Sequence, residues 1–403
     1  MKPTAIPANR LDPADPDAFF DLCAAPNNLI HFLLNVGDGD TQLVLLPRIG
    51  DEARRAVVVD VSGGQKAKLP ALVATLQQAG LLAPPQADNS TPAHRKAFPI
   101  VVGTHPHDDH IGGMAGFIDL FRFDIASYWD AGYYLPSGAF IETMEALEQN
   151  PHIAWAQPAS GLSQFLDDVR ILVLGPGITL KHQYDSYGVD PNNASIALKF
   201  EYPYKRVQVR SERVASAAVS QQEQLSGRLY AKVRSVKSLV LGGDAQAREW
   251  AQIQADHPRL ESKFSPVFSE LKMARGIEPL TATVFKVSHH ASKRGIYLEL
   301  LEALNPRISL VSSVGGKGKH GFPHDVAQDA IREAKEKIAK TGAARSDDHQ
   351  LNIYYTSDTR AGGTSLGTIA TVIPASGSVQ LWRFEDQRAE LVDLNKARRL
   401  NQP

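Results

Sequence analysis

Three histidines and two aspartates are concentrated within six residues of the segment Thr104–Gly113, whose sequence is THPHDDHIGG. The segment follows directly on the apolar run Phe98–Val102. Imidazole nitrogens and carboxylate oxygens are ligands that zinc accepts, and manganese or iron would accept them too. The alternative is a solvated polar loop that happens to be rich in histidine. Because a predicted strand leads into the cluster and a predicted helix follows it, we favour a metal-binding loop.

The spacing of these side chains predicts two cation positions. His105 and His107 are two residues apart, so in an extended loop their rings point the same way and share one ion. Asp109 and His110 begin the next helical turn and, offset from the first pair, reach a second ion. The hydroxyl of Thr104 is a candidate for orienting a ligand, although turn formation alone would explain that residue equally well.

A helix is predicted after the loop because apolar residues follow at helical spacing. They are Ile111, Met114, Phe117 and Ile118. Between them, Gly112 and Gly113 would let the backbone approach the ions closely.

Two other predicted strands end in residues that can bind cations. The strand 238–241 is followed by Gly242-Gly243-Asp244, and the strand 283–287 by Ser288-His289-His290. Asp244 could bridge two cations, although an aspartate that merely starts a turn is the simpler explanation if the segment is taken alone. One of the two adjacent histidines can bind metal while the other hydrogen-bonds a substrate or a ligand.

The composition is that of an ordinary globular protein, with 43% hydrophobic and 22% charged residues in 403. No apolar stretch approaches the roughly 18 residues that a spanning helix needs, and no secretory signal is recognisable at the N-terminus. We therefore expect a cytoplasmic protein without a membrane partner. The single cysteine, Cys23, excludes an internal disulfide and is expected to be a small buried residue.

The net charge of −1 gives no overall attraction to nucleic acid, but the charge is uneven. Residues 205–237 contain eight basic and two acidic side chains, an excess of six. This segment is either a solvated linker or a contact for a polyanion.

Strands and helices are predicted to alternate along the chain, which indicates an α/β fold. Further strands are expected at 31–46, 56–61, 169–174, 195–202, 308–314, 353–355, 367–373 and 378–384. Helices are expected at 66–79, 140–149 and 385–400, and from Asp325 to Lys340 with an apolar stripe of Val326, Ala330, Ile331, Ala334 and Ile338. Insertions are expected near 80–96, 203–237 (with a linker at 215–227) and 341–349.

Taken together, these motifs resemble those of the metallo-β-lactamase superfamily. The shared features are a His-x-His-x-Asp-His loop, an aspartate at an upstream strand end, a bridging aspartate and a late histidine. Within the superfamily the chain is similar to the soluble hydrolase domain of the DNA-internalisation competence channel protein and its stand-alone relatives. The matching segments are 35–40 (NVGDGD), 192–195 (NNAS), 243–245 (GDA) and 286–292 (KVSHHAS).

The resemblance covers about residues 29–385 and implies a four-layered αββα sandwich. Residues 1–28 would be an N-terminal extension and 386–403 a C-terminal helix or tail. Carried over by position, the implied metal ligands are His105 and His107 for the first ion, Asp109 and His110 for the second, Asp244 as the bridge, and His289 or His290 to complete the second position. The resemblance implies zinc, as one or two ions.

It also implies several catalytic candidates besides Asp109. Asp60 would steady the metal loop by hydrogen bonds. Lys286 would either face the site or cap its strand. His324 would either donate a proton to the leaving group or cap the following helix.

The chain departs from the resembled pattern in two places. Most superfamily hydrolases supply a further histidine to the first ion, whereas here the matching stretch is Asn192–Ser195 and the nearest histidine, His182, lies in a loop. Whether one ion or two bind is therefore open. Second, Gly321-Phe322-Pro323-His324 stands where the subfamily has Gly-His-Pro-His, with His320 displaced two positions earlier.

Two adjacent cations would lower the pKa of a shared water and stabilise charge at the reacting centre, so hydrolysis is the expected chemistry. We expect a phosphodiesterase or nuclease that uses metal-bound hydroxide on DNA, RNA or a nucleotide. The cations expected near the strand ends are Lys286, Lys293, Arg294, Lys317 and Lys319. Alternatives are a small-molecule ester hydrolase, acting on a phosphocholine ester or a lactone from a closed apolar pocket, and a non-catalytic metal-binding sensor or partner-binding protein. The sequence does not determine the oligomeric state.

Overall fold

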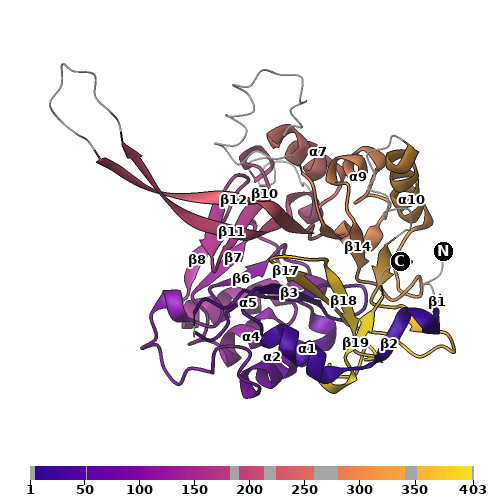
Figure 1. The fold of residues 1–403 in the computed structure, drawn as a ribbon, viewed down its shortest axis with the longest axis horizontal. Helices are drawn as coiled ribbons and strands as arrows, with labels where there is room; N and C mark the ends of the chain where they lie inside the picture. The colour runs from indigo at the N-terminus through magenta and orange to yellow at the C-terminus, as the bar shows by residue number, and fades with distance from the viewer. Residues whose placement is uncertain are drawn as a thin grey trace.

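The structure is a computed structural model that describes residues 5–50, 52–181, 190–212, 224–257, 280–340 and 352–401, with the backbone alone at 205–212, 224–235 and 338–340. Two sheets form its centre (Figure 1). The ten-stranded sheet has the order β2 (Leu11–Ala14), β19 (Arg398–Leu400), β18 (Gln380–Arg383), β17 (Ile369–Pro374), β3 (Asn28–Leu33), β4 (Thr41–Leu45), β5 (Ala56–Val61), β6 (Ile100–Gly103), β7 (Ser127–Asp130) and β8 (Ala154–Ala156). The seven-stranded sheet has the order β15 (Ile353–Tyr355), β14 (Ile308–Val311), β13 (Val284–Lys286), β12 (Gln224–Leu241), β11 (Ala197–Glu212), β10 (Val169–Gly175) and β9 (Ser163–Leu166). A parallel pair, β1 (Ala5–Ile6) and β16 (Thr359–Arg360), stands apart from both sheets.

Helices cover the outer face of each sheet (Figure 1). Packed on the ten-stranded sheet are α1 (Pro16–Ala24), α2 (Lys68–Gln78), α3 (Asp108–Ile111), α4 (Met114–Leu120) and α5 (Gly138–Gln149). Packed on the seven-stranded sheet are α7 (Ala247–Asp256), α9 (Leu298–Leu304) and α10 (Asp325–Lys340). A third apolar cluster lies between the two sheets. These three cores separate four layers, which confirms the predicted αββα sandwich.

Strand β5 shows why the sequence folds into inner layers. Its run of valines is buried on both faces, with Val57 and Val59 in the cluster between the sheets and Val58 in the cluster under the helices. A continuous apolar strand of this kind is typical of a parallel sheet covered on both sides. Accordingly, β5 pairs in parallel with β6, and β12 with β13. The carboxyl ends of such strands meet at one edge of each sheet, where their loops can form a site.

Some predicted elements differ from the structure. The strand expected at 31–46 is a hairpin of β3 and β4, since Gly37–Asp40 forms the turn between them. The helix expected at 385–400 is wrong, because this segment contains a short 3-10 helix, Leu394–Lys396, and the strand β19. Pairing of β19 with β18 and β2 favours the extended form. Val326 in the predicted stripe of α10 is 59% exposed, whereas its neighbour Ala327 is buried.

The basic segment 205–237 belongs to β11 and β12, which continue as a long antiparallel ribbon out to the pair Glu212 and Gln224 (Figure 1). Both strands are therefore much longer than predicted. Residues 215–223 of the expected linker, His182 and the insertion at 341–349 lie outside the described residues.

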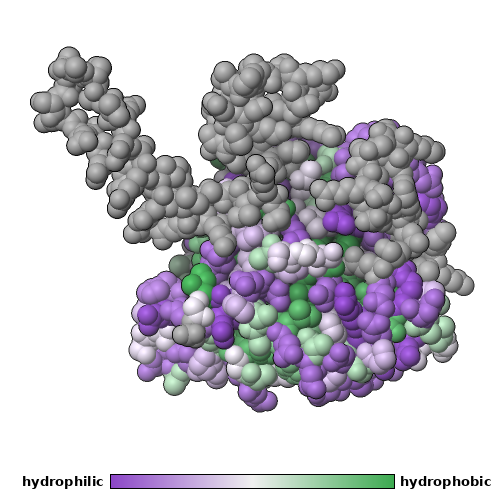
Figure 2. Space-filling model, viewed as in Figure 1, coloured by the Kyte–Doolittle hydropathy of each residue, from purple (hydrophilic) through white to green (hydrophobic). Residues whose placement is uncertain are grey.

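The polar character of the surface fits a molecule whose apolar side chains are packed in three inner clusters. On the face shown in Figure 2, hydrophilic side chains predominate over the lower part of the molecule, with smaller hydrophobic patches between them. Within the described ranges, each helix is too short or too polar to cross a lipid bilayer. Cys23 is buried on α1, as expected of a small apolar residue.

Candidate metal centre

The loops that follow β5, β6, β12 and β13 bring the predicted site residues together at one edge of the sandwich. Asp244, which follows β12, lies at the middle of the cluster and is buried. Its Oδ1 lies 3.2 Å from Nε2 of His110, and its Oδ2 lies 3.9 Å from Nε2 of His105. The two oxygens of one carboxylate therefore face two different sets of side chains.

The second cation position is outlined by atoms that have no other partner. Nε2 of His110, Nε2 of His290 and Oδ1 of Asp244 are buried and make no hydrogen bond. His290 Nε2 lies 3.6 Å from Asp244 Oδ1 and 4.0 Å from Oδ2 of Asp109. Leaving three buried polar atoms unpaired is costly unless a ligand satisfies them. Two imidazoles and two carboxylates fit a divalent cation such as zinc, so His290 rather than His289 lies at this position.

The first cation position lies on the other side of Asp244. His105 Nε2 and His107 Nδ1 face each other at 3.0 Å, and both belong to the extended segment between β6 and α3. His289 approaches the same side, with its Nε2 3.7 Å from Asp244 Oδ2. Asp109, whose side chain is 46% exposed, leaves the cluster open to solvent.

Asp60, at the end of β5, holds the metal loop through three hydrogen bonds. Its Oδ1 accepts from the backbone N–H of Thr104 at 2.7 Å, and its Oδ2 accepts from the Thr104 hydroxyl at 2.8 Å. Oδ2 also lies 2.8 Å from Nδ1 of His110, which leaves Nε2 of that ring free to face the centre. The same hydroxyl lies 3.2 Å from His105 Nδ1. One buried carboxylate thus fixes a ring at each cation position, an arrangement common around metal-binding histidines.

The electrostatics of the cluster are those of a carboxylate among imidazoles. Burial opposes ionisation of Asp244, but His110, His290 and His289 together hold its pKa well below the usual range. Burial lowers the pKa of His110, yet Asp244, Asp60 and Asp109 more than offset this and raise it well above normal. Burial and the neighbouring His110 lower the pKa of His105, which favours the neutral ring that a cation requires.

Lys286 does not line the open face of the cluster, because its side chain is completely buried and pairs with Asp40. Asp40 follows the glycine turn after β3, and its Oδ1 lies 3.8 Å from Nδ1 of His290. That ring nitrogen also lies 3.0 Å from the carbonyl oxygen of Ser312. The buried ion pair of Lys286 and Asp40 therefore lies next to Nδ1 of His290 and does not line the open face of the cluster.

Phe322, which stands where the resembled subfamily has a histidine, covers the histidine pair. Its ring centroid lies 5.3 Å from that of His289 and 5.6 Å from that of His290. His324 packs against the same ring at 5.2 Å, and its Nδ1 accepts the backbone N–H of Lys293 at 3.1 Å. His324 therefore lies beside the cluster and outside the group of ligand atoms.

The paired glycines allow two loops to pack closely. A Cβ on Gly112 would lie 2.8 Å from Cα of Gly63, and one on Gly113 would lie 2.8 Å from a methyl group of Val61. Both neighbours belong to the end of β5 and the turn after it. Glycine is therefore required at both positions by the contact between the two loops, and the close approach of backbone to ions stays a prediction.

Glu249 on α7 is a second buried carboxyl group near the centre. Its Oε2 accepts the backbone N–H of Ser195 at 3.2 Å, whereas its Oε1 has no partner. Burial raises the pKa of Glu249 well above normal. We therefore expect the protonated form in the folded protein.

Replacing this group by an amide is expected to stabilise the protein at neutral and alkaline pH. Because the pKa is higher in the folded state, the folded protein binds the extra proton above the ordinary glutamate pKa of about 4.3, and stability then falls as pH rises by up to ~1.4 kcal/mol per pH unit. Glu249→Gln removes this slope, which urea unfolding between pH 5 and 9 measures. Glu148→Gln, on the exposed face of α5, should leave it unchanged. An unaltered slope in Glu249→Gln would show that the carboxyl is ionised after all.

Several contributing residues were not singled out from the sequence for the roles they have here. In the sequence, Asp40 was only part of the segment 35–40 that resembles the competence-protein hydrolase domain. Phe322 was only the residue that stands where that subfamily has a histidine. Glu249 lies in a polar helical stretch without any local signal. A glycine-flanked aspartate at a strand end, as in Gly39-Asp40, was the one usable indication.

No protein-family model matches the chain, and no curated protein matches it in sequence. Among solved structures it is similar to CmlA, a diiron β-hydroxylase from Streptomyces venezuelae, with 8% identity and a TM-score of 0.35 over 86% of this chain and 54% of that one. The chain thus spans about half the length of that enzyme. It is also similar to a B3 metallo-β-lactamase with an active-site glutamic acid (12% identity, TM-score 0.29, 77% of this chain and 90% of that one). A metallo-β-lactamase of Cronobacter sakazakii with a HARLDQ motif gives 12% identity and a TM-score of 0.27, over 84% and 98%. What the chain shares with them is a likeness of fold.

Proposed function

We propose that the protein is a metal-dependent hydrolase of phosphodiesters, with a nuclease as the specific form. The observation that carries this is Asp244, whose two carboxylate oxygens face two separate groups of imidazole nitrogens. Two divalent cations held about 3.5–4 Å apart would activate a water and offset charge on a reacting phosphate. An aspartate bridge between two histidine-rich positions supports this arrangement.

The protein's own groups would keep this centre ready for the reaction. Asp60 and the Thr104 hydroxyl fix the rings of His105 and His110, and the Ser312 carbonyl fixes His290. Preorganised ligands of this kind need no rearrangement when charge develops.

His324 is the proposed proton donor to the leaving group. Because its Nδ1 accepts the N–H of Lys293, the neutral ring carries its proton on Nε2. Burial and the charge of Lys293 lower the pKa of His324, which favours that neutral form at neutral pH. A neutral imidazole can donate the proton of its Nε2 to an alkoxide oxygen.

The charge around the opening supports a phosphate substrate. Lys293, Arg294, Lys317 and Lys319 are exposed on the loops that follow β13 and β14, the loops that carry His289, His290 and Ser312. Exposed cations raise the local concentration of a polyanion and make its binding dependent on salt. The resemblance to the competence-protein hydrolase domain also supports nucleic acid as the substrate class.

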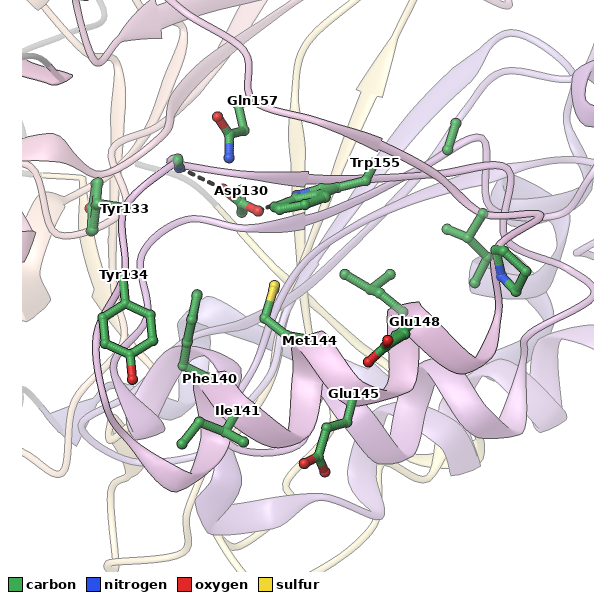
Figure 3. Close-up of a pocket in the computed structure, with 15 residues that line it drawn as sticks. Asp130, Tyr133, Tyr134, Phe140, Ile141, Met144, Glu145, Glu148, Trp155 and Gln157 are labelled. Carbon is green, nitrogen blue, oxygen red and sulfur yellow. Dashed lines mark hydrogen bonds between the residues drawn. The ribbon is translucent and has the colours of Figure 1, made fainter.

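The ester-hydrolase alternative has less support. An apolar cavity of about 820 Å³ runs along α5 and β8 (Figure 3), where Tyr134, Phe140 and Trp155 line it. In Figure 3 the indole of Trp155 lies beside Asp130, to which it donates a hydrogen bond. The residues that line this cavity do not include the histidines or aspartates around Asp244.

The test is turnover by protein of known metal content. We expect zinc- or manganese-loaded protein to hydrolyse bis(p-nitrophenyl) phosphate and at least one of single-stranded DNA, double-stranded DNA or RNA. A chelator should stop the reaction and added metal should restore it. Nucleic-acid hydrolysis should weaken as salt rises. Metal-loaded protein that hydrolyses p-nitrophenyl phosphorylcholine or a lactone, and none of these substrates, would replace the proposal with the ester-hydrolase alternative.

A further inference from the structure

The first cation position lacks a ligand from the strand that follows the metal loop. At the start of β11 the chain has Ser195, whose backbone N–H donates to Glu249 and whose hydroxyl accepts the N–H of Asp244 at 3.3 Å. In the described stretch around it, residues 190–204, no residue is a histidine. His105, His107 and one oxygen of Asp244 are three ligand groups, whereas four are usual for zinc.

The two adjacent histidines after β13 have a rare backbone conformation. His289 has φ 51° and ψ 45°, and His290 has φ 53° and ψ 30°. Ala291, which follows them, has φ 62°. Left-handed conformations are unfavourable for residues that carry a Cβ, because the Cβ comes too close to the following carbonyl oxygen. Three in succession persist only where the surroundings enforce them, and such strain concentrates at functional sites.

This left-handed turn directs both rings onto the same carboxylate. Neighbouring side chains point to opposite faces of a strand and diverge by about 100° on a helix. Here Nε2 of His290 lies 3.6 Å from Oδ1 of Asp244, and Nε2 of His289 lies 3.7 Å from Oδ2. Placing only one ring at the centre would not require the neighbouring residue to be strained as well.

We propose that His289 is the third imidazole ligand of the first cation position, where it replaces the histidine missing near Ser195. The position then has His105 Nε2, His107 Nδ1, His289 Nε2 and Asp244 Oδ2 as ligands, which suits zinc. The adjacent histidines thus serve different ions. The inference rests on one part of the proposed function, namely that the centre binds cations, and it does not require phosphodiester hydrolysis.

The surroundings of the other ring nitrogen, Nδ1 of His289, have to rearrange for this role. His289 Nδ1 lies 3.4 Å from the side-chain amide nitrogen of Gln246. When Nε2 binds a cation, Nδ1 carries the proton and needs an acceptor. The Gln246 amide also donates to Oδ2 of Asp190 at 3.2 Å, and its oxygen accepts from the Asn193 side-chain amide at 3.3 Å. Exchanging the oxygen and nitrogen of Gln246 would give Nδ1 an acceptor, at the cost of the bond to Asp190 and with the Asn193 amide turned as well.

The test is metal stoichiometry in variants that keep the backbone. Asparagine tolerates the left-handed conformation. His289→Asn therefore removes the imidazole ring while the backbone at position 289 keeps its left-handed turn. Elemental analysis after dialysis should give two zinc ions for the wild type and one each for His289→Asn and Asp109→Asn. The double variant should hold none. His94→Asn, at an exposed histidine on a different loop, should retain two.

Thermal unfolding separates a ligand from a residue that only shapes the turn. His289→Gly should unfold at a higher temperature than the wild type when metal-free, because glycine relieves the strain. The stabilisation by added zinc should be smaller in His289→Gly and His289→Asn than in the wild type.

Two zinc ions in His289→Asn, one in the double variant, or an unchanged stabilisation by zinc would overturn the inference. Wild-type protein that holds two ions but hydrolyses no phosphodiester would remove the proposed function and leave the assignment of His289 intact.

Discussion

Asp244→Asn is expected to remove both cations and to lower phosphodiester turnover by on the order of 10³-fold or more. Loss of a residue that only orients a metal ligand typically costs 10- to 100-fold, and Asp244 faces both positions directly. An amide keeps the shape of the side chain but offers one weakly basic oxygen in place of two anionic ones. Elemental analysis and single-turnover kinetics at saturating zinc measure the two effects.

The matched control is Asp119→Asn, an aspartate on the exposed side of α4. It should keep the wild-type metal content and rate. If Asp244→Asn retained two ions, the bridging arrangement would be wrong, and the two positions would have to be held by the histidines and Asp109 alone.

Lys286→Met is expected to destabilise the protein by about 3–5 kcal/mol, which is typical when one partner of a buried ion pair is removed. Burial opposes ionisation of Asp40, but Lys286, His290 and His110 keep its pKa below normal. Without the ammonium group, a buried carboxylate loses its main compensating charge. Urea unfolding of the metal-free protein near pH 7 measures the loss.

The double variant Lys286→Met/Asp40→Leu is the control, because removal of both charges leaves neither unpaired and should restore much of the stability. The pair has a definite pH dependence. Since the Asp40 pKa is depressed in the folded state, its contribution is complete above about pH 4 and declines as the pH falls through the folded value. A loss below about 1 kcal/mol in Lys286→Met would show that the lysine is not needed to neutralise Asp40.

Buried, nearly continuous apolar runs were predictable from the sequence because they leave a local signal. Strand β5 and the helical face from Ile111 to Ile118 were expected at these positions, and these apolar residues are buried. The metal loop was recognisable for a similar reason, since its ligands are close together in the chain. Asp244 and His290 are distant from that loop in the sequence. Their approach to it could be expected only because each follows the end of a strand, and these two strands, β12 and β13, are parallel.

Elements that depend on distant pairing were not predictable. Residues 398–400 are two arginines and a leucine, which become a strand only because β18 and β2 lie on either side. The basic segment in the ribbon of β11 and β12 was expected to be either a solvated linker or a contact for a polyanion, although Val207 and Val209 alternate with polar residues as in a strand. Lys286 could be placed at a strand end but not behind His290, because its partner, Asp40, is 246 residues away.

The order of strands in the larger sheet also limits when the protein can fold during its synthesis. Strand β3 (Asn28–Leu33) lies between β4 and β17, and β17 (Ile369–Pro374) is far from both in the sequence. A nascent chain on the ribosome therefore holds β3 with an open, aggregation-prone edge until residues near 370 have emerged. Pairing across so long a separation is slow, so the sheet that carries Asp60 and the metal loop closes only after β17 has been synthesised.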